Sequence, residues 1–190
     1  MFLERLKTLT KPFHDEVEHH SINQNLFAHE ASDKEYGEFL QLQYLMFTSL
    51  EQEIVRYSSS LLDIGIEYHC RAHLAEKELK HLNIPVGEEK VTFELDDLSS
   101  VLAAVYLLEG SRHGAMVLLK TLRTIMPSDH DFLFLESNPQ EFVVRWKRMA
   151  QTFEQYASDK EIENAFILNV CRLYCAMGVV YDNHRTTDKL

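Results

Sequence analysis

Apolar residues recur at helical spacing along most of this chain. From Asp33, the expected N-cap, to about Tyr57 they return every three or four residues and form one broad apolar face. Residues 97–125 are almost continuously apolar in their middle, which predicts a helix buried on most sides and stopped by Pro127. The same periodicity predicts further helices at about 2–20, 67–82, 139–156 and 159–180, which makes about six main helices.

Capping residues and helix breakers set the limits of these helices. Asn138 followed by Pro139 is typical of an N-cap and the first helical residue, and Asp159 is the expected cap of the last helix. Pro12 lies inside the first segment, so either its main helix starts near Thr10 or the helix kinks there. Serines 58–60 and a glycine at 65 break the pattern before the third helix, and residues 88–95 are a loop or a short extended stretch.

Composition supports a single all-α domain. The chain has only six glycines and four prolines in 190 residues, below the usual shares of ~7% and ~5% that supply turns. A hydrophobic content of 45% is enough for a sizeable core. We therefore expect one helical domain over residues 1–180 and a polar C-terminal tail over residues 181–190.

Charge and cysteine usage narrow the class of protein. A net charge of -11 argues against a nucleic-acid partner, because phosphate binding needs clustered Lys and Arg. An anionic ligand would need a local basic patch. The three cysteines (Cys70, Cys171 and Cys175) have no metal-type spacing and fit a reducing compartment. No run approaches the ~20 apolar residues of a membrane span, so we expect a cytoplasmic protein without a membrane partner.

The first helix carries a candidate binding stripe. If this segment is helical throughout, Lys7, Lys11, His14 and Glu18 lie on one face. A lone histidine on a helix is usually a surface or satisfied core residue. Two lysines on its face favour another interpretation, since an iron porphyrin offers an open axial site for an imidazole and carboxylates for the lysines. Glu18, one turn away, could then hydrogen-bond the other ring nitrogen and fix its tautomer.

Two glycines interrupt the most apolar helix. Gly110 and Gly114 lie four residues apart, and each costs ~1 kcal/mol relative to alanine in a helix interior. One interpretation is that they let another helix pack closely. The other is that the missing side chains let the backbone approach a flat ligand and leave space for a small molecule on its face. The spacing alone does not choose between them.

Four segments together resemble heme oxygenases, the bacterial type in particular. They are the Leu6–Glu18 helix, Leu50-Glu51-Gln52-Glu53-Ile54, the block Tyr106-Leu107-Leu108-Glu109-Gly110-Ser111-Arg112-His113-Gly114-Ala115, and Ala165-Phe166-Ile167-Leu168-Asn169. The resemblance implies a heme oxygenase-like bundle with heme held between a proximal and a distal helix. It also implies the family's activity, in which O₂ and electrons from a ferredoxin- or flavodoxin-type reductase open the porphyrin to biliverdin, carbon monoxide and ferrous iron.

The resemblance also implies residue roles. His14 would be the proximal iron ligand, and the catalytic distal face would be formed by Gly110, Ser111 and Gly114. Heme would further be bound by Lys7, Lys11, Glu18, Arg112, His113, Lys147, Phe166 and Asn169. Arg145 is an alternative to Lys147 as a cation for the heme propionates. Lys120 and Arg123 are either part of a reductase docking patch or solvated helix residues.

The departures from the family keep other functions open. Ser111 stands where animal members carry a distal aspartate, and Arg112 and His113 stand where bacterial members tend to have a polar and then an apolar residue. If His113 reached the iron, two histidines would bind it and exclude O₂, which would suit a heme carrier or sensor. If it points away, it is a packed or surface histidine. A third possibility is thiaminase-like or di-iron chemistry on the same scaffold, since a fold does not fix function.

Overall fold

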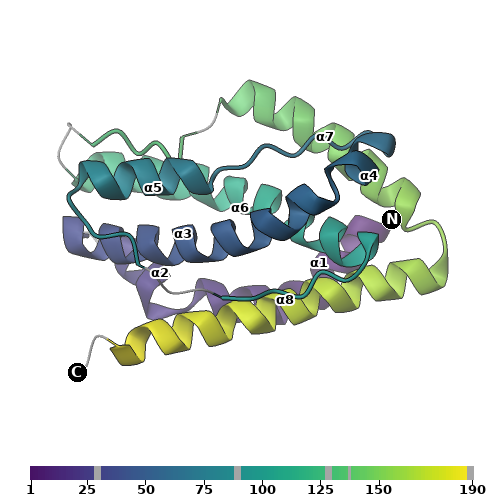
Figure 1. Ribbon diagram of the computed structural model, residues 1–190, viewed down its shortest axis with the longest axis horizontal. Coiled ribbons are helices and arrows are strands. Elements are labelled where there is room, and N and C mark those ends of the chain that lie inside the picture. Colours follow the sequence, from purple (N-terminus) through teal and green to yellow (C-terminus); the bar gives the residue numbers. More distant parts are fainter. Residues whose placement is uncertain (28–30, 88–90, 127–129, 137, 188–190) are drawn as a thin grey trace.

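The computed structural model describes residues 1–27, 31–87, 91–126, 130–136 and 138–187, and all regular structure in these ranges is helical (Figure 1). The helices are α1 (Phe2–Glu18), α2 (Ser21–Phe27), α3 (Asp33–Arg56), α4 (Ser58–Asp63), α5 (Ala72–His81), α6 (Leu98–Ile125), α7 (Pro139–Tyr156) and α8 (Lys160–Thr187). The predicted all-α class is confirmed, with six longer helices and the two short ones α2 and α4.

Helix caps lie close to the positions expected. Asp97 and Ser100 form a reciprocal capping box at the start of α6. The Asn138 side chain accepts hydrogen bonds from the first turn of α7. For α3 the predicted N-cap was wrong by one residue, because Ser32 rather than Asp33 forms the capping box with Glu35.

Several boundaries differ from the predicted ones. Helix α1 continues through Pro12 from Phe2 onward, so its main helix does not start near Thr10. Serines 58–60 begin the short helix α4, which buries Leu61, instead of a break. Helix α8 continues to Thr187, seven residues beyond the expected end, because Val180 and Tyr181 are still buried against the core. The predicted tail is therefore helical as far as Thr187, and residues 188–190 lie outside the described residues, as do residues 88–90 of the predicted loop or extended stretch.

Helix α5 begins five residues later than predicted, at Ala72. The buried carboxylate of Glu51, on α3, accepts hydrogen bonds from the backbone N–H groups of Arg71 at 2.6 Å and Ala72 at 3.0 Å. An acidic group at a helix N-terminus satisfies donors that have no partner within the helix. A side chain from another helix therefore decides where α5 starts.

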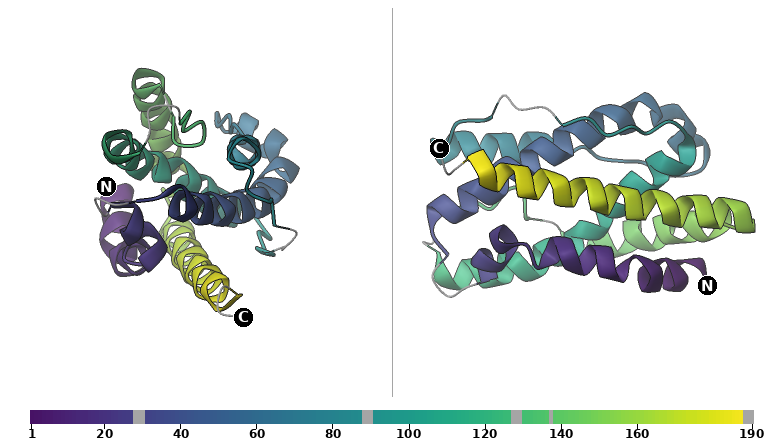
Figure 2. Two further views of the ribbon diagram at one scale, coloured as in Figure 1. Left: turned by 90° about the vertical axis from the view of Figure 1, so that its left-hand side faces the viewer. Right: turned by 90° about the horizontal axis from the view of Figure 1, so that it is seen from below.

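Helix α8 contacts both α1 and α6. It packs along α1 on one side and along α6 on another, while α3 packs on α5 (Figure 2). Phe166 of α8 is fully buried and meets the rings of Phe2 at 5.1 Å, Tyr106 at 6.3 Å and Phe153 at 5.7 Å. These four rings come from α8, α1, α6 and α7, so one aromatic cluster joins four helices.

The apolar composition of α8 is relevant to whether the protein could contact a membrane. Over Lys160–His184 this helix is long and apolar enough, by length and composition, to cross a membrane. In the fold it lies against α1 and α6 instead. A cytoplasmic location stays a prediction.

We expect Phe166→Ala to lower the free energy of unfolding by about 3–5 kcal/mol, because it leaves a cavity where four helices meet. Phe166→Leu should cost less, since it keeps most of the volume. Urea unfolding of both variants measures this effect. Leu168→Ala is the control on the same helix, because Leu168 is 50% exposed, and a similar loss in the control would contradict the role of the cluster.

Candidate functional site

A cavity of about 780 Å³ opens between α1 and α6. This volume lies within the ~300–1,000 Å³ usual for small-molecule and cofactor sites. Helix α1 supplies one wall and α6 the opposite one, while α2, α3, α7, α8, Arg71 and the segment around residues 134 and 135 complete the lining.

The predicted stripe on α1 lines this cavity. Lys7, Lys11, His14 and Glu18 all contribute to the wall, so their shared face is confirmed. Lys11 forms an ion pair at 2.6 Å with Asp15, which also lines the cavity. The hydrogen bond from Lys11 holds the pKa of the Asp15 carboxyl below its usual value.

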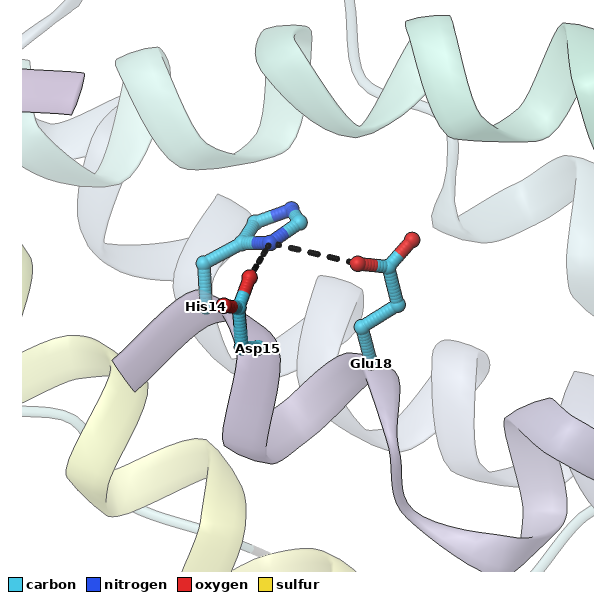
Figure 3. Close-up of side chains that lie close together, drawn as sticks. All are labelled: His14, Asp15 and Glu18. Carbon is cyan, nitrogen blue, oxygen red and sulfur yellow. Dashed lines mark ion pairs between the residues drawn. The ribbon is translucent and has the colours of Figure 1, made fainter. Parts of the chain in front are cut away.

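His14 projects into the cavity with both carboxylates beside the same ring nitrogen (Figure 3). Its Nδ1 lies 3.5 Å from a Glu18 oxygen and 3.7 Å from an Asp15 oxygen. Both separations exceed the ~2.7–3.2 Å of a normal hydrogen bond, so the expected hydrogen bond between Glu18 and the His14 ring is not formed in this structure. The ring meets Tyr174 of α8 edge-on at 5.7 Å between centroids, which limits how it can turn.

The opposite wall contains the two glycines and the serine. Gly110, Ser111 and Gly114 line the cavity, and the Ser111 hydroxyl donates to the carbonyl of Leu108 at 2.7 Å. A Cβ placed on Gly114 would meet nothing within 4 Å, and one on Gly110 would meet only the Trp146 ring, at 3.7 Å. Close helix packing therefore does not explain these glycines, and they leave open space in front of α6.

His113 packs against α7. Its ring lies edge-on to Phe142 at 4.7 Å and to Trp146 at 5.2 Å, and its Nδ1 is 3.2 Å from the carbonyl of Gly110. The residue is among those lining the cavity. Its contacts nevertheless match the interpretation of a packed histidine, with one nitrogen turned to its own helix.

The comparisons with known proteins agree with this geometry. The sequence model of the heme oxygenase family matches residues 1–93. A heme oxygenase from Neisseria meningitidis, solved with NO and CO bound, superposes with a TM-score of 0.79 and 21% identity, covering 97% of this chain and 92% of that one. The chain has the heme oxygenase fold. Heme oxygenase-1 from the cyanobacterium Synechocystis, solved in complex with heme, gives a TM-score of 0.76 and 13% identity, with 96% and 91% covered.

The family resemblance inferred from the sequence is confirmed by these matches. No curated protein matches the chain.

On this heme oxygenase fold, four of the predicted heme-binding residues are not at the cavity wall. Phe166 is fully buried in the aromatic cluster, and Asn169 donates to the Ser99 hydroxyl at 3.3 Å. Lys147 is exposed on α7, and Arg112 is buried beside Glu109. Whether each of these side chains reaches the cavity depends on how its helix is rotated about its axis. The sequence motifs do not contain that information.

A buried ion-pair network lies behind the distal wall. The Glu109 side chain is 2% exposed and lies 2.9 Å from Arg112 Nε and 2.7 Å from Arg145 Nη2. Arg145, the alternative propionate cation, is thus already paired. Burial lowers the pKa of the Arg112 guanidinium, although Glu109 raises it. The heme contact expected for Arg112 stays a prediction, while in this structure its guanidinium pairs with Glu109.

Arg71 is a buried cation that sequence reasoning missed. It lines the cavity and is only 3% exposed, with its guanidinium carbon 4.8 Å above the Phe134 ring. Its Nη2 donates to the carbonyl of Phe134. Burial, followed by repulsion from Arg112, lowers the pKa of Arg71 to about 10.

Sequence reasoning also missed much of the cavity lining. Aromatic rings come from Tyr106, Trp146 and Tyr174, and burial raises the pKa of the Tyr174 hydroxyl above its usual value. At one part of the wall, the Tyr181 hydroxyl accepts from Gln43 at 3.1 Å and donates to Asn23 at 3.4 Å. These residues come from five different helices, so no local motif unites them.

Within the described ranges, one group of three metal-type side chains has converging ligand atoms: His14, Asp15 and Glu18, all within 4.8 Å of one another. The carboxylate-rich pair of motifs that di-iron chemistry needs is not formed by these residues. The di-iron chemistry raised by the sequence therefore gains no support from the described residues.

We expect Glu109→Gln to lower the free energy of unfolding by about 3–5 kcal/mol, because it removes the buried carboxylate that pairs with buried Arg112 and half-buried Arg145. Urea unfolding of the full chain measures this. Glu16→Gln makes the same change at an exposed position of α1 and should shift stability by no more than about 0.5 kcal/mol. Equal stabilities of the two variants would contradict the importance of the network.

Proposed function

We propose that this protein is a heme-degrading enzyme that binds heme between α1 and α6. The observation that carries the proposal is the position of His14 on one wall of the cavity, opposite the glycine-bearing stretch of α6. The heme oxygenase fold and the family match over residues 1–93 support it. One structural relative was solved in complex with heme.

The cavity fits an iron porphyrin in three respects. Its volume of about 780 Å³ suits a cofactor-sized ligand. His14 offers an imidazole of the kind that ligates heme iron. Lys7 and Lys11 supply positive charge for carboxylates in a chain whose net charge is -11.

The residues on the two walls of the cavity would have different roles in heme binding. His14 would hold the iron, and Glu18 would orient the imidazole through Nδ1. Lys7 and Lys11 would bind the propionates, for which Lys11 must release Asp15; this costs little because the Lys11 side chain is 70% exposed. Gly110 and Gly114 would keep side chains away from the open face, and Ser111 would present a hydroxyl there.

The bound heme would supply the oxygen chemistry, and its own ring is the substrate opened to biliverdin, carbon monoxide and ferrous iron. The electrons would come from a ferredoxin- or flavodoxin-type reductase in the cytoplasm. Arg123 is paired with Glu136, which leaves Lys120 as the more available cation of the suggested docking patch.

A non-catalytic heme carrier or sensor is the alternative from a different class. It needs His113 to occupy the second axial position of the iron. The packing of this ring against Phe142 and Trp146 does not favour that role. An unchanged ferric heme spectrum in His113→Ala would count against the alternative, whereas a change from low to high spin would support it.

Hemin titration tests the proposed function directly. Wild type should bind one hemin per chain and, with a reductase or ascorbate in air, lose the heme absorption band as biliverdin forms. His14→Ala should bind hemin about tenfold more weakly or worse and should not turn it over. His19→Ala changes an exposed histidine that follows α1 and does not line the cavity, and it is the matched control. Intact heme after incubation of wild type would refute the proposal.

The glycines provide a second test that separates folding from ligand space. Gly114→Leu should fold normally and gain up to about 1 kcal/mol in stability from helix propensity, because nothing lies within 4 Å of the added Cβ. The same side chain would fill the space in front of α6 and weaken hemin binding by about tenfold or more.

Gly178→Leu is the matched control for this variant. Gly178 lies within α8, its added Cβ also meets nothing within 4 Å, and it does not line the cavity. Both variants should gain similar stability by urea unfolding, but only Gly114→Leu should lose hemin affinity. Equal hemin affinities would show that the space at Gly114 is not used by the ligand.

A further inference from the structure

The cavity wall carries a second kind of binding site on α1. His14, Asp15 and Glu18 bring one imidazole nitrogen and two carboxylates within 4.8 Å of one another, and all three line the cavity (Figure 3). We propose that the heme-free protein binds one divalent transition-metal ion at His14 Nδ1 and the carboxylates of Asp15 and Glu18.

The spacing of these atoms suits a bridging cation better than direct contact. Nδ1 is 3.5 Å from Glu18 and 3.7 Å from Asp15, too far for normal hydrogen bonds. Two ligand atoms that are each ~2.1 Å from a metal ion at tetrahedral or octahedral angles lie roughly 3.0–3.4 Å apart. Small side-chain rotations would therefore bring the three atoms to coordination distance.

The donor set fits the metal class. One imidazole with two carboxylates suits first-row divalent ions such as Fe²⁺, Co²⁺ and Zn²⁺. Two carboxylates also balance the charge of the ion, and the net charge of -11 favours cations at this surface. Because the three side chains occupy one side of a single turn of α1, the backbone already holds them together before an ion arrives.

Lys11 is the group that competes for this site. Its ammonium pairs with both oxygens of Asp15, at 2.6 and 2.8 Å. The Lys11 side chain is 70% exposed, so its ion pair with Asp15 is screened by solvent and stabilises the protein little. A bound divalent ion would displace it, and a Lys11→Gln variant should bind the ion more tightly than wild type.

The site uses the ring nitrogen that heme does not need. A heme iron would take Nε2 of His14, while Glu18 faces Nδ1. The inference therefore goes beyond the proposed function and does not depend on it. If both are correct, a neutral imidazole cannot serve both metals at once, and the divalent ion belongs to the heme-free state.

Titration of the heme-free full chain with Co²⁺ alone tests the proposal, with the visible absorption of bound Co²⁺ and calorimetry as readouts. Wild type should bind one ion at this site. His14→Ala and Glu18→Gln should each weaken that binding about tenfold or more, with helicity unchanged by circular dichroism. His19→Ala, at the C-cap of α1, and Glu16→Gln, within α1, are matched changes outside the cluster and should stay within about twofold of wild type.

Three outcomes of the Co²⁺ titration would overturn the proposed metal site. Absence of Co²⁺ binding in wild type, or equal binding in wild type and His14→Ala, would overturn the site. Loss of Co²⁺ binding in the controls as well would place the ion elsewhere among the ten histidines and would also overturn it. Because no heme is present, failure here leaves the hemin titration unaffected, and failure of hemin binding leaves this result unaffected.

Discussion

The site depends on one constraint, which is that α8 packs against α1 and α6 at the same time. A single long helix fixes the positions of both walls, and the space between them remains open as a cavity of about 780 Å³. The cluster around Phe166 connects these helices with α7 through contacts of aromatic rings. Well-packed interiors resist deformation, so this cluster keeps the cavity from collapsing. The aromatic residue expected at the ligand instead supports the walls that surround it.

A buried ion-pair network similarly holds α6 and α7 together. Glu109 is paired with Arg112 from its own helix and with Arg145 from α7, which ties the distal stretch to α7. Desolvation makes buried ion pairs poor net stabilisers, but removing one partner is costly. The network therefore specifies the position of α7 more than it adds stability. Trp146, the residue after Arg145, contacts the His113 ring at 5.2 Å between centroids.

The sequence predicted those parts of the structure that depend on local rules. The cap at Asn138 was found because capping needs only neighbouring residues. The stripe from Lys7 to Glu18 followed from helical periodicity alone. The start of α5 was missed, because Glu51 from another helix caps it. Helix α8 was predicted too short, because burial of Tyr181 depends on partners far away in the chain.

The same distinction separates the expected site residues that line the cavity from those that do not. Gly110, Ser111 and Gly114 line the cavity because three residues of one helical turn share a face. Phe166, Asn169 and Lys147 were assigned by motif, and whether they face the cavity depends on how α7 and α8 are rotated. Rotation is decided by packing between helices, which no single segment encodes. At Gly114, local helix propensity and tertiary packing do not agree. Glycine is unfavourable inside a helix, yet an added Cβ at this position would meet nothing within 4 Å. A local cost without a packing gain is expected where a binding site needs the space.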